Sequence, residues 1–235
     1  MNSAKRKILV SGYVAVTLAA FGTAIAVLLT YTPTEDTMGP IQKIFYLHLP
    51  LAINTFVAAL VTFVASVGYL WQRKGWWDDL ASAAARVAVL YCTGVLLTGM
   101  IWGRSAWGQW WTWSPRLTFS LMLWLLYAVY LMVRTSVESP QRRATVCAVY
   151  AIIAFLDVPL VWLSARLMPD IHPSSIQLAS SMKLTLALWF VPVTLASAGL
   201  IVGGFVLQKA LREAGRRVPD TISHPPRLPA RGGVA

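Results

Sequence analysis

Five tryptophans lie within twelve consecutive residues, although the whole chain of 235 residues has only 11. They are Trp102, Trp107, Trp110, Trp111 and Trp113. Trp107, Trp110 and Trp111 are spaced i, i+3 and i+4, so a helix would place them on one face. Indole rings arranged in this way form a flat apolar platform, which can stack against a large, flat ring system. An aromatic belt at a membrane interface is the alternative, but it does not require five indoles in one loop.

Two arginines bracket this tryptophan cluster, Arg104 on one side and Arg116 on the other. A guanidinium group pairs well with a carboxylate. A flat apolar ring with carboxylates at its edge describes haem, so we predict that these arginines bind the propionates. A quinone fits the apolar platform but not the paired arginines, and it ranks second.

Two histidines are predicted on the same side of the molecule as the tryptophans. His48 lies in the run Phe-Tyr-Leu-His-Leu-Pro, and His172 lies in Met-Pro-Asp-Ile-His-Pro. A neutral imidazole is a common axial ligand of haem iron. We therefore predict that His48 and His172 bind the iron from opposite sides of the ring. The chain has no CxxCH motif, so the predicted cofactor is non-covalent haem b.

The elements that position these residues are long apolar segments. The chain is 57% hydrophobic and only 12% charged, and a helix needs about 20 mainly apolar residues to cross a bilayer. We predict an all-α polytopic membrane protein with one domain, residues 1–214, and a disordered cytoplasmic tail, residues 215–235. The six predicted spans are 8–31, 44–72, 87–103, 117–133, 144–165 and 184–208. In the fifth span Pro159 follows the acidic Asp157, which predicts a local break in that helix.

The basic residues indicate the orientation in the membrane. Of the 20 lysines and arginines, 15 flank the spans on the side of the two termini. Because basic loops stay in the cytoplasm, we predict that both termini are cytoplasmic and that the tryptophan-rich loop is periplasmic, in a bacterial inner membrane. On this interpretation, the net positive charge of the chain is related to its orientation in the lipid bilayer. Nucleic acid is not a predicted partner.

The sequence has no nucleotide-binding, zinc-binding or catalytic-triad motif, so it is not predicted to be an enzyme. Two other functional classes stay open. A b-type electron-transfer cytochrome would need histidines near both membrane faces. A haem or solute permease subunit would need polar residues along a path through the membrane, where Asn54 and Asp157 are the obvious ones.

The tryptophan-rich segment resembles the WWD signature of haem-handling proteins in cytochrome c maturation. The segment reads WGQWWTW from Trp107 to Trp113 and continues as PRLT from Pro115. With six spans and the two histidines, the chain resembles the heme exporter protein C family most. The resemblance implies that His48 and His172 are the axial ligands. It implies partners as well: a periplasmic haem chaperone, the subunits of a cytochrome-maturation ABC transporter and a small membrane accessory subunit. The predicted haem platform comprises Trp102, Trp107, Gly108, Trp110, Trp111, Trp113 and Ser114.

The sequence departs from this signature at one position. Ser114 stands where the signature has its acidic residue. A hydroxyl is a weaker acceptor for anchoring a loop than a carboxylate, although Ser before Pro still shapes a turn. Without a carboxylate at position 114, this residue is not expected to fill a role that needs a negative charge, such as pairing with Arg116. The aromatic platform does not depend on that charge.

Overall fold

The fold is all-α in the computed structural model, which describes residues 3–36, 38–167 and 178–217. No strand forms among these residues, apart from one isolated bridge between Glu35 and Gly39. Six spans are long and apolar enough to cross a membrane, as predicted, with α5 and α6 sharing one of them. The helices are α1 Ser3–Thr30, η1 Pro40–Ile44, α2 Phe45–Gln72, α3 Gly75–Trp107, α4 Pro115–Ser136, α5 Pro140–Ala154, α6 Asp157–Leu167 and α7 Ser180–Arg217.

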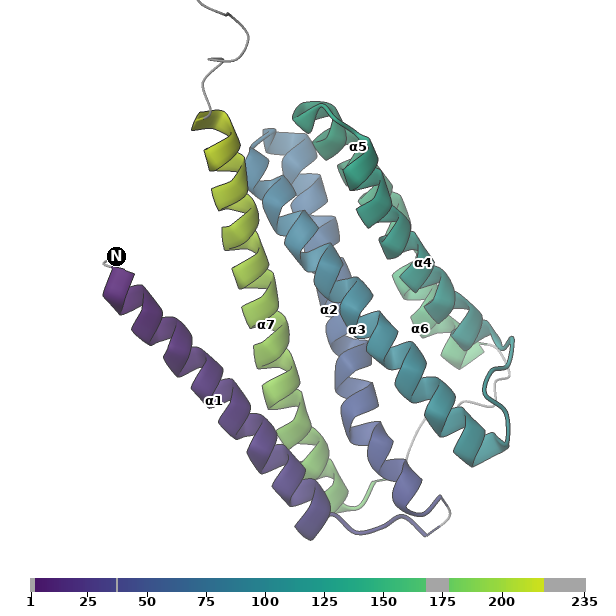
Figure 1. The fold of residues 1–235 in the computed structure, drawn as a ribbon. Coiled ribbons are helices and arrows are strands. Elements are labelled where there is room, and N and C mark those ends of the chain that lie inside the picture. The colour runs from purple at the N-terminus through teal and green to yellow at the C-terminus, as the bar shows by residue number, and fades with distance from the viewer. Residues whose placement is uncertain (1–2, 37, 168–177, 218–235) are drawn as a thin grey trace, which may run out of the picture.

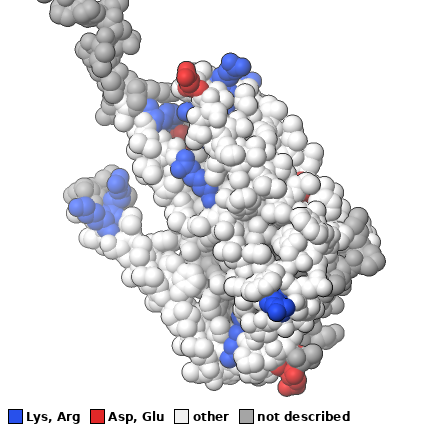
Figure 2. Space-filling model, turned by 45° about the vertical axis from the view of Figure 1, so that its right-hand side comes forward, with Lys and Arg blue, Asp and Glu red and all other residues white. Residues whose placement is uncertain are grey.

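Successive spans run in opposite directions, so the bundle has two ends (Figure 1). We call the end that holds the start of α2, the end of α3 and the start of α4 the Trp end. The other end, which holds the start of α3, the end of α4 and the end of α7, is the basic end. Between the two ends the surface has a broad band with few charged groups (Figure 2). This distribution is typical of a bundle that spans a bilayer.

The centre of the bundle is the pair of helices α2 and α3, which approach each other closely through small residues. Ala58 and Ala59 of α2 and Ala84 and Ala85 of α3 are fully buried. A Cβ atom on Gly68 would lie only 2.7 Å from the Trp77 ring. Small residues at helix interfaces are typical of membrane bundles, because they allow van der Waals contact between backbones. By contrast, α1 packs mainly against α7 at the edge of the bundle (Figure 1).

The fifth span is broken between α5 and α6, as the sequence predicts. Pro159 has no N–H group to donate to the carbonyl four residues earlier. The backbone instead forms two shorter-range hydrogen bonds, from Leu156 to Ile153 at 3.1 Å and from Val158 to Phe155 at 3.0 Å. Asp157 follows the break and is only 4% exposed, and neither of its carboxylate oxygens has a hydrogen-bond partner.

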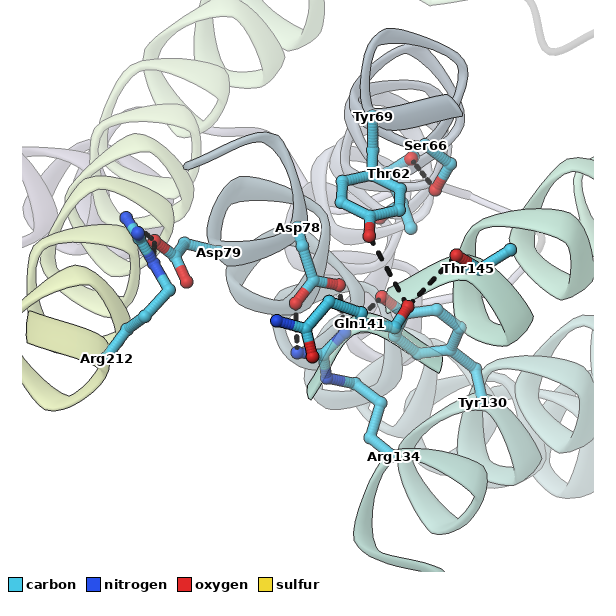
Figure 3. Close-up of polar contacts among 10 residues, drawn as sticks. All are labelled: Thr62, Ser66, Tyr69, Asp78, Asp79, Tyr130, Arg134, Gln141, Thr145 and Arg212. Atoms are coloured by element: carbon cyan, nitrogen blue, oxygen red, sulfur yellow. Dashed lines mark hydrogen bonds and ion pairs between the residues drawn. The ribbon is translucent and has the colours of Figure 1, made fainter. Parts of the chain in front are cut away.

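The third span begins at Gly75, not at residue 87. The charge-free segment starts at residue 87 because Arg86 precedes it, whereas the helix continues back through Arg86, Asp79 and Asp78. In the structure both acids are buried and paired with arginines of other helices (Figure 3). Asp78 binds Arg134 with oxygen–nitrogen distances of 2.6 and 2.9 Å, and Asp79 binds Arg212 at 2.8 Å. Paired carboxylates can be accommodated in a packed helix, whereas unpaired ones are costly.

Candidate functional site

A cleft opens at the Trp end between the end of α3 and the start of α4. It encloses about 510 Å³ of space, counting its open mouth. The walls are mostly apolar and carry a few polar groups. The lining residues are His48, Val95, Leu96, Gly99, Met100, Trp102, Trp107, Trp111, Arg116, Leu117 and Ser120.

His48 lies in the first turns of α2 and forms part of the cleft wall. Its Nδ1 atom is 2.8 Å from the Thr98 hydroxyl. That hydroxyl donates its one proton to the Gly94 carbonyl at 2.6 Å, so it accepts a hydrogen bond from the ring. With the ring proton on Nδ1, as this arrangement of acceptors favours, the lone pair of a neutral His48 is on Nε2. This is the tautomer of a histidine whose Nε2 binds a metal, with its other nitrogen held by a second residue.

Two residues of α3 fix the orientation of the His48 ring. The Trp102 ring meets it edge-on, with centroids 5.9 Å apart and planes at 75°. Gly99, also on α3, lies close to the ring, since a Cβ atom there would be 3.3 Å from Cε1 of His48. A larger residue at position 99 would therefore crowd the ring. Three further site residues were not predicted from the sequence: Thr98, Gly99 and Ser120. Their contacts depend on how α3 packs against α2 and α4, which no local sequence pattern shows.

The tryptophans do not share one helical face, so that prediction is wrong. Helix α3 ends at Trp107, and Trp110 and Trp111 lie in the following loop. The helix stops because Gly108 adopts the left-handed conformation, with φ of 75°, and its N–H group bonds to the Arg104 carbonyl at 3.1 Å. Glycine adopts this conformation without steric cost and commonly ends helices.

The predicted platform divides into an inner and an outer group. Trp102 and Trp107 stack with planes at 24° and centroids 6.5 Å apart, and both line the cleft together with Trp111. Trp110 and Trp113 point away from the interior and are 59% and 76% exposed. The inner group provides ring surfaces for a ligand, whereas the outer group provides an aromatic surface.

The two predicted arginines have different surroundings. Arg116, in the first turn of α4, is half-buried and lines the cleft. It is the one arginine or lysine among the described lining residues. Arg104 is exposed and donates a hydrogen bond to the Gly108 carbonyl, which stabilises the turn after α3. Arg104 is not among the described residues that line the cleft, and its binding to a propionate stays a prediction.

The loop between α3 and α4 contains several buried polar atoms without a hydrogen-bond partner. These are Trp111 Nε1, Thr112 Oγ1 and Ser114 Oγ. Ser114 is the N-cap residue of α4, yet its side chain makes no capping bond. Buried polar atoms of this kind are rare in folded proteins, where most have a hydrogen-bond partner. Their position beside the cleft is consistent with a bound molecule that carries hydrogen-bonding groups.

The second predicted ligand, His172, lies outside the described residues. The described residues on either side of that segment are Leu167, which ends α6, and Leu178, shortly before α7 begins at Ser180. The end of α6 and the start of α7 both lie toward the Trp end (Figure 1). Iron binding by His172 therefore stays a prediction. The predicted tail, residues 215–235, starts too early, because α7 continues to Arg217, and residues 218–235 lie outside the described part.

Comparison with known proteins supports a single family. The family model described as heme exporter protein C matches residues 1–218. A heme exporter protein C from Bradyrhizobium diazoefficiens is 33% identical over 146 residues, covering 61% of this chain and 55% of that protein. The Paracoccus denitrificans protein of that name is 36% identical over 130 residues, covering 54% of each chain. The protein of the same name from Escherichia coli K12 is 28% identical over 153 residues, covering 64% of this chain and 62% of that one. The matched part thus spans about half the length of the first two relatives. The match to the family model covers most of the chain, which therefore belongs to the heme exporter protein C family.

Proposed function

We propose that this protein binds haem b non-covalently at the Trp end and passes it to a periplasmic haem chaperone for the maturation of c-type cytochromes. The observation that carries the proposal is the hydrogen bond between His48 and Thr98. This bond favours a proton on Nδ1, which would leave the Nε2 lone pair of His48 for a ligand in an apolar, aromatic cleft. Neutral imidazole is the usual nitrogen ligand of haem iron.

The residues around the cleft fit a haem group. His48 would bind the iron on one side and His172 on the other. The rings of Trp107 and Trp111 would lie against the porphyrin, and Arg116 would pair with a propionate. When bound, haem would supply an iron atom that the two histidines can ligate. Haem is the cargo in this proposal, so the protein is not chemically changed by its transfer. The protein is thus a binding and transfer protein and not an enzyme.

Transfer requires a site that opens toward the partner. Trp111, which lines the cleft, lies in the same loop as the exposed Trp110 and Trp113, and exposed aromatic groups often mark a protein interface. We assign this loop to the docking of the haem chaperone. The subunits of the ABC transporter and a small accessory subunit would contact the protein within the inner membrane. The positive-inside rule places both termini in the cytoplasm and the Trp end in the periplasm.

The docking role can be tested with the purified, haem-loaded protein and the haem-free chaperone. In a Trp110→Ala/Trp113→Ala variant we expect haem to be retained but its transfer to slow at least about tenfold, because aromatic residues dominate such interfaces. The matched control is Trp71→Ala, since Trp71 is 86% exposed at the basic end. Unchanged transfer in the double variant would contradict the docking role, and absence of transfer in the wild type would contradict the proposed function.

A further inference from the structure

The basic end contains a second cleft, which is separate from the proposed haem site. It encloses about 760 Å³, counting its open mouth. Its walls come from α3, α4, α5 and α7. We propose that this cleft binds the phosphate of an anionic phospholipid from the leaflet at the basic end. The lining residues are Arg86, Leu131, Arg134, Thr135, Arg143 and Gln208.

The position of the cleft along the helices corresponds to the level of lipid phosphates. Each of its four longest polar side chains lies directly at the edge of a charge-free or nearly charge-free apolar segment. Arg86 precedes segment 87–103, Arg134 follows 117–133, Arg143 precedes 144–165 and Gln208 ends 184–208. Four helices thus bring a polar group to the same boundary. That boundary lies between the hydrocarbon core and the headgroups, where phosphates are found.

Among the described residues, the positive charge of this cleft is only partly balanced by carboxylates. Arg134 is neutralised by Asp78, as described above. Arg86 and Arg143 have no carboxylate within 4.0 Å among the residues that the structure describes. The Nε atom of Arg143 is also buried without a hydrogen-bond partner. A buried, unpaired guanidinium nitrogen is costly, and a phosphate would remove that cost because the guanidinium fork binds phosphate oxygens in pairs.

The surroundings of the cleft favour a lipid over a free phosphate. Leu131 of α4 lies in the cleft wall next to the arginines. On α3, Leu90 lies one turn from Arg86 toward the middle of the span, on the same helical face. Leu90 is 56% exposed. An acyl chain can follow this apolar surface while the phosphate stays at Arg86 and Arg143. Two unpaired positive charges also favour an anionic headgroup over a zwitterionic one, whose choline group would be repelled.

The proposal is tested by counting lipids retained by the detergent-purified full-length protein in native mass spectrometry. The protein is incubated with phosphatidylglycerol or with phosphatidylcholine of the same acyl chains. In an Arg86→Gln/Arg143→Gln variant we expect phosphatidylglycerol retention to fall at least about tenfold, since each lost charge-assisted contact contributes roughly that factor. The matched control is Lys74→Gln/Arg142→Gln, which removes two exposed charges at the same end and is expected to retain the lipid.

Three results would overturn the proposal. The first is equal retention of the two lipids by the wild type, a comparison that does not depend on any variant folding. The second is equal retention of phosphatidylglycerol by the Arg86→Gln/Arg143→Gln variant and the wild type. The third is displacement of the lipid by glycerol phosphate at equal concentration, because the cleft would then recognise a free phosphate.

Discussion

The His48 side chain is held by contacts from α3, a helix on which the histidine itself does not lie. Thr98 forms a hydrogen bond with Nδ1, Trp102 meets the ring edge-on, and Gly99 leaves the space that the ring occupies. These three residues lie within about one turn of α3. The chemistry proposed for His48 therefore depends on how α2 and α3 pack against each other.

The role of Thr98 can be separated from that of His48. A Thr98→Val substitution keeps the shape of the side chain but removes the acceptor for Nδ1. We expect haem affinity to fall by about 10–100-fold, the usual effect of removing the residue that orients a metal-binding histidine. The measurement is a haem titration followed by absorbance.

A suitable control for that experiment is Thr55→Val. Thr55 is buried in α2 and, like Thr98, donates its hydroxyl proton to a carbonyl one turn earlier, that of Leu51 at 2.9 Å. Among the described residues, no histidine forms a hydrogen bond with the Thr55 hydroxyl. Equal affinity in Thr98→Val and in the control would show that the hydroxyl does not orient His48.

At the scale of elements, the ion pair between α3 and α4 fixes the basic end of the bundle. Asp78 and Arg134 are joined by two hydrogen bonds and both are largely buried (Figure 3). Removing only one member leaves the other charge buried without a partner. Removing both charges avoids that cost, so the two changes are not additive.

We therefore expect Arg134→Gln to lower the free energy of unfolding by about 3–5 kcal/mol. The double substitution Asp78→Asn/Arg134→Gln should recover most of this loss. Both are measured by chemical unfolding in the same detergent without added lipid. If the double variant is as unstable as Arg134→Gln, the pair does not act as a buried unit.

The elements also show what the sequence could and could not predict. Charge-free segments are a local property, so six spans follow from the sequence, and Pro159 indicates the break before α6. The start of α3 does not follow, because the partners of its two acids lie on α4 and α7. For the tryptophans the spacing suggested a helix, but the conformation of Gly108 ends α3 first. The apolar cleft itself depends on the packing of three helices and has no counterpart in any single segment.

At the scale of the whole molecule, the few cations at the Trp end have local roles. Lys43 donates to the Leu28 carbonyl at 3.0 Å, near the end of α1, where carbonyls lack partners within the helix. Arg166 lies over the Trp162 ring, 3.9 Å from its centroid. Arg116 lines the cleft. Of the 20 lysines and arginines, 15 flank the spans on the side of the basic end, and the positive-inside rule predicts that this end is cytoplasmic.

This orientation gives a prediction for the intact cell. Trp110 and Trp71 are exposed at opposite ends of the bundle, whereas the two native cysteines are buried. A membrane-impermeant maleimide should label a Trp110→Cys variant once the outer membrane is permeable. It should label Trp71→Cys only after the inner membrane is disrupted. The reverse pattern would contradict the predicted orientation.

The two histidines are proposed to hold haem at the Trp end. The most direct test is the visible absorption spectrum of the purified protein after addition of haem. The wild type should show a sharp Soret band with the features of low-spin iron bound by two imidazoles. A His48→Ala/His172→Ala variant should lose those features, and His224→Ala, which removes the third histidine, should keep them. A double variant with the wild-type spectrum would contradict the account, since haem would then be held by other residues.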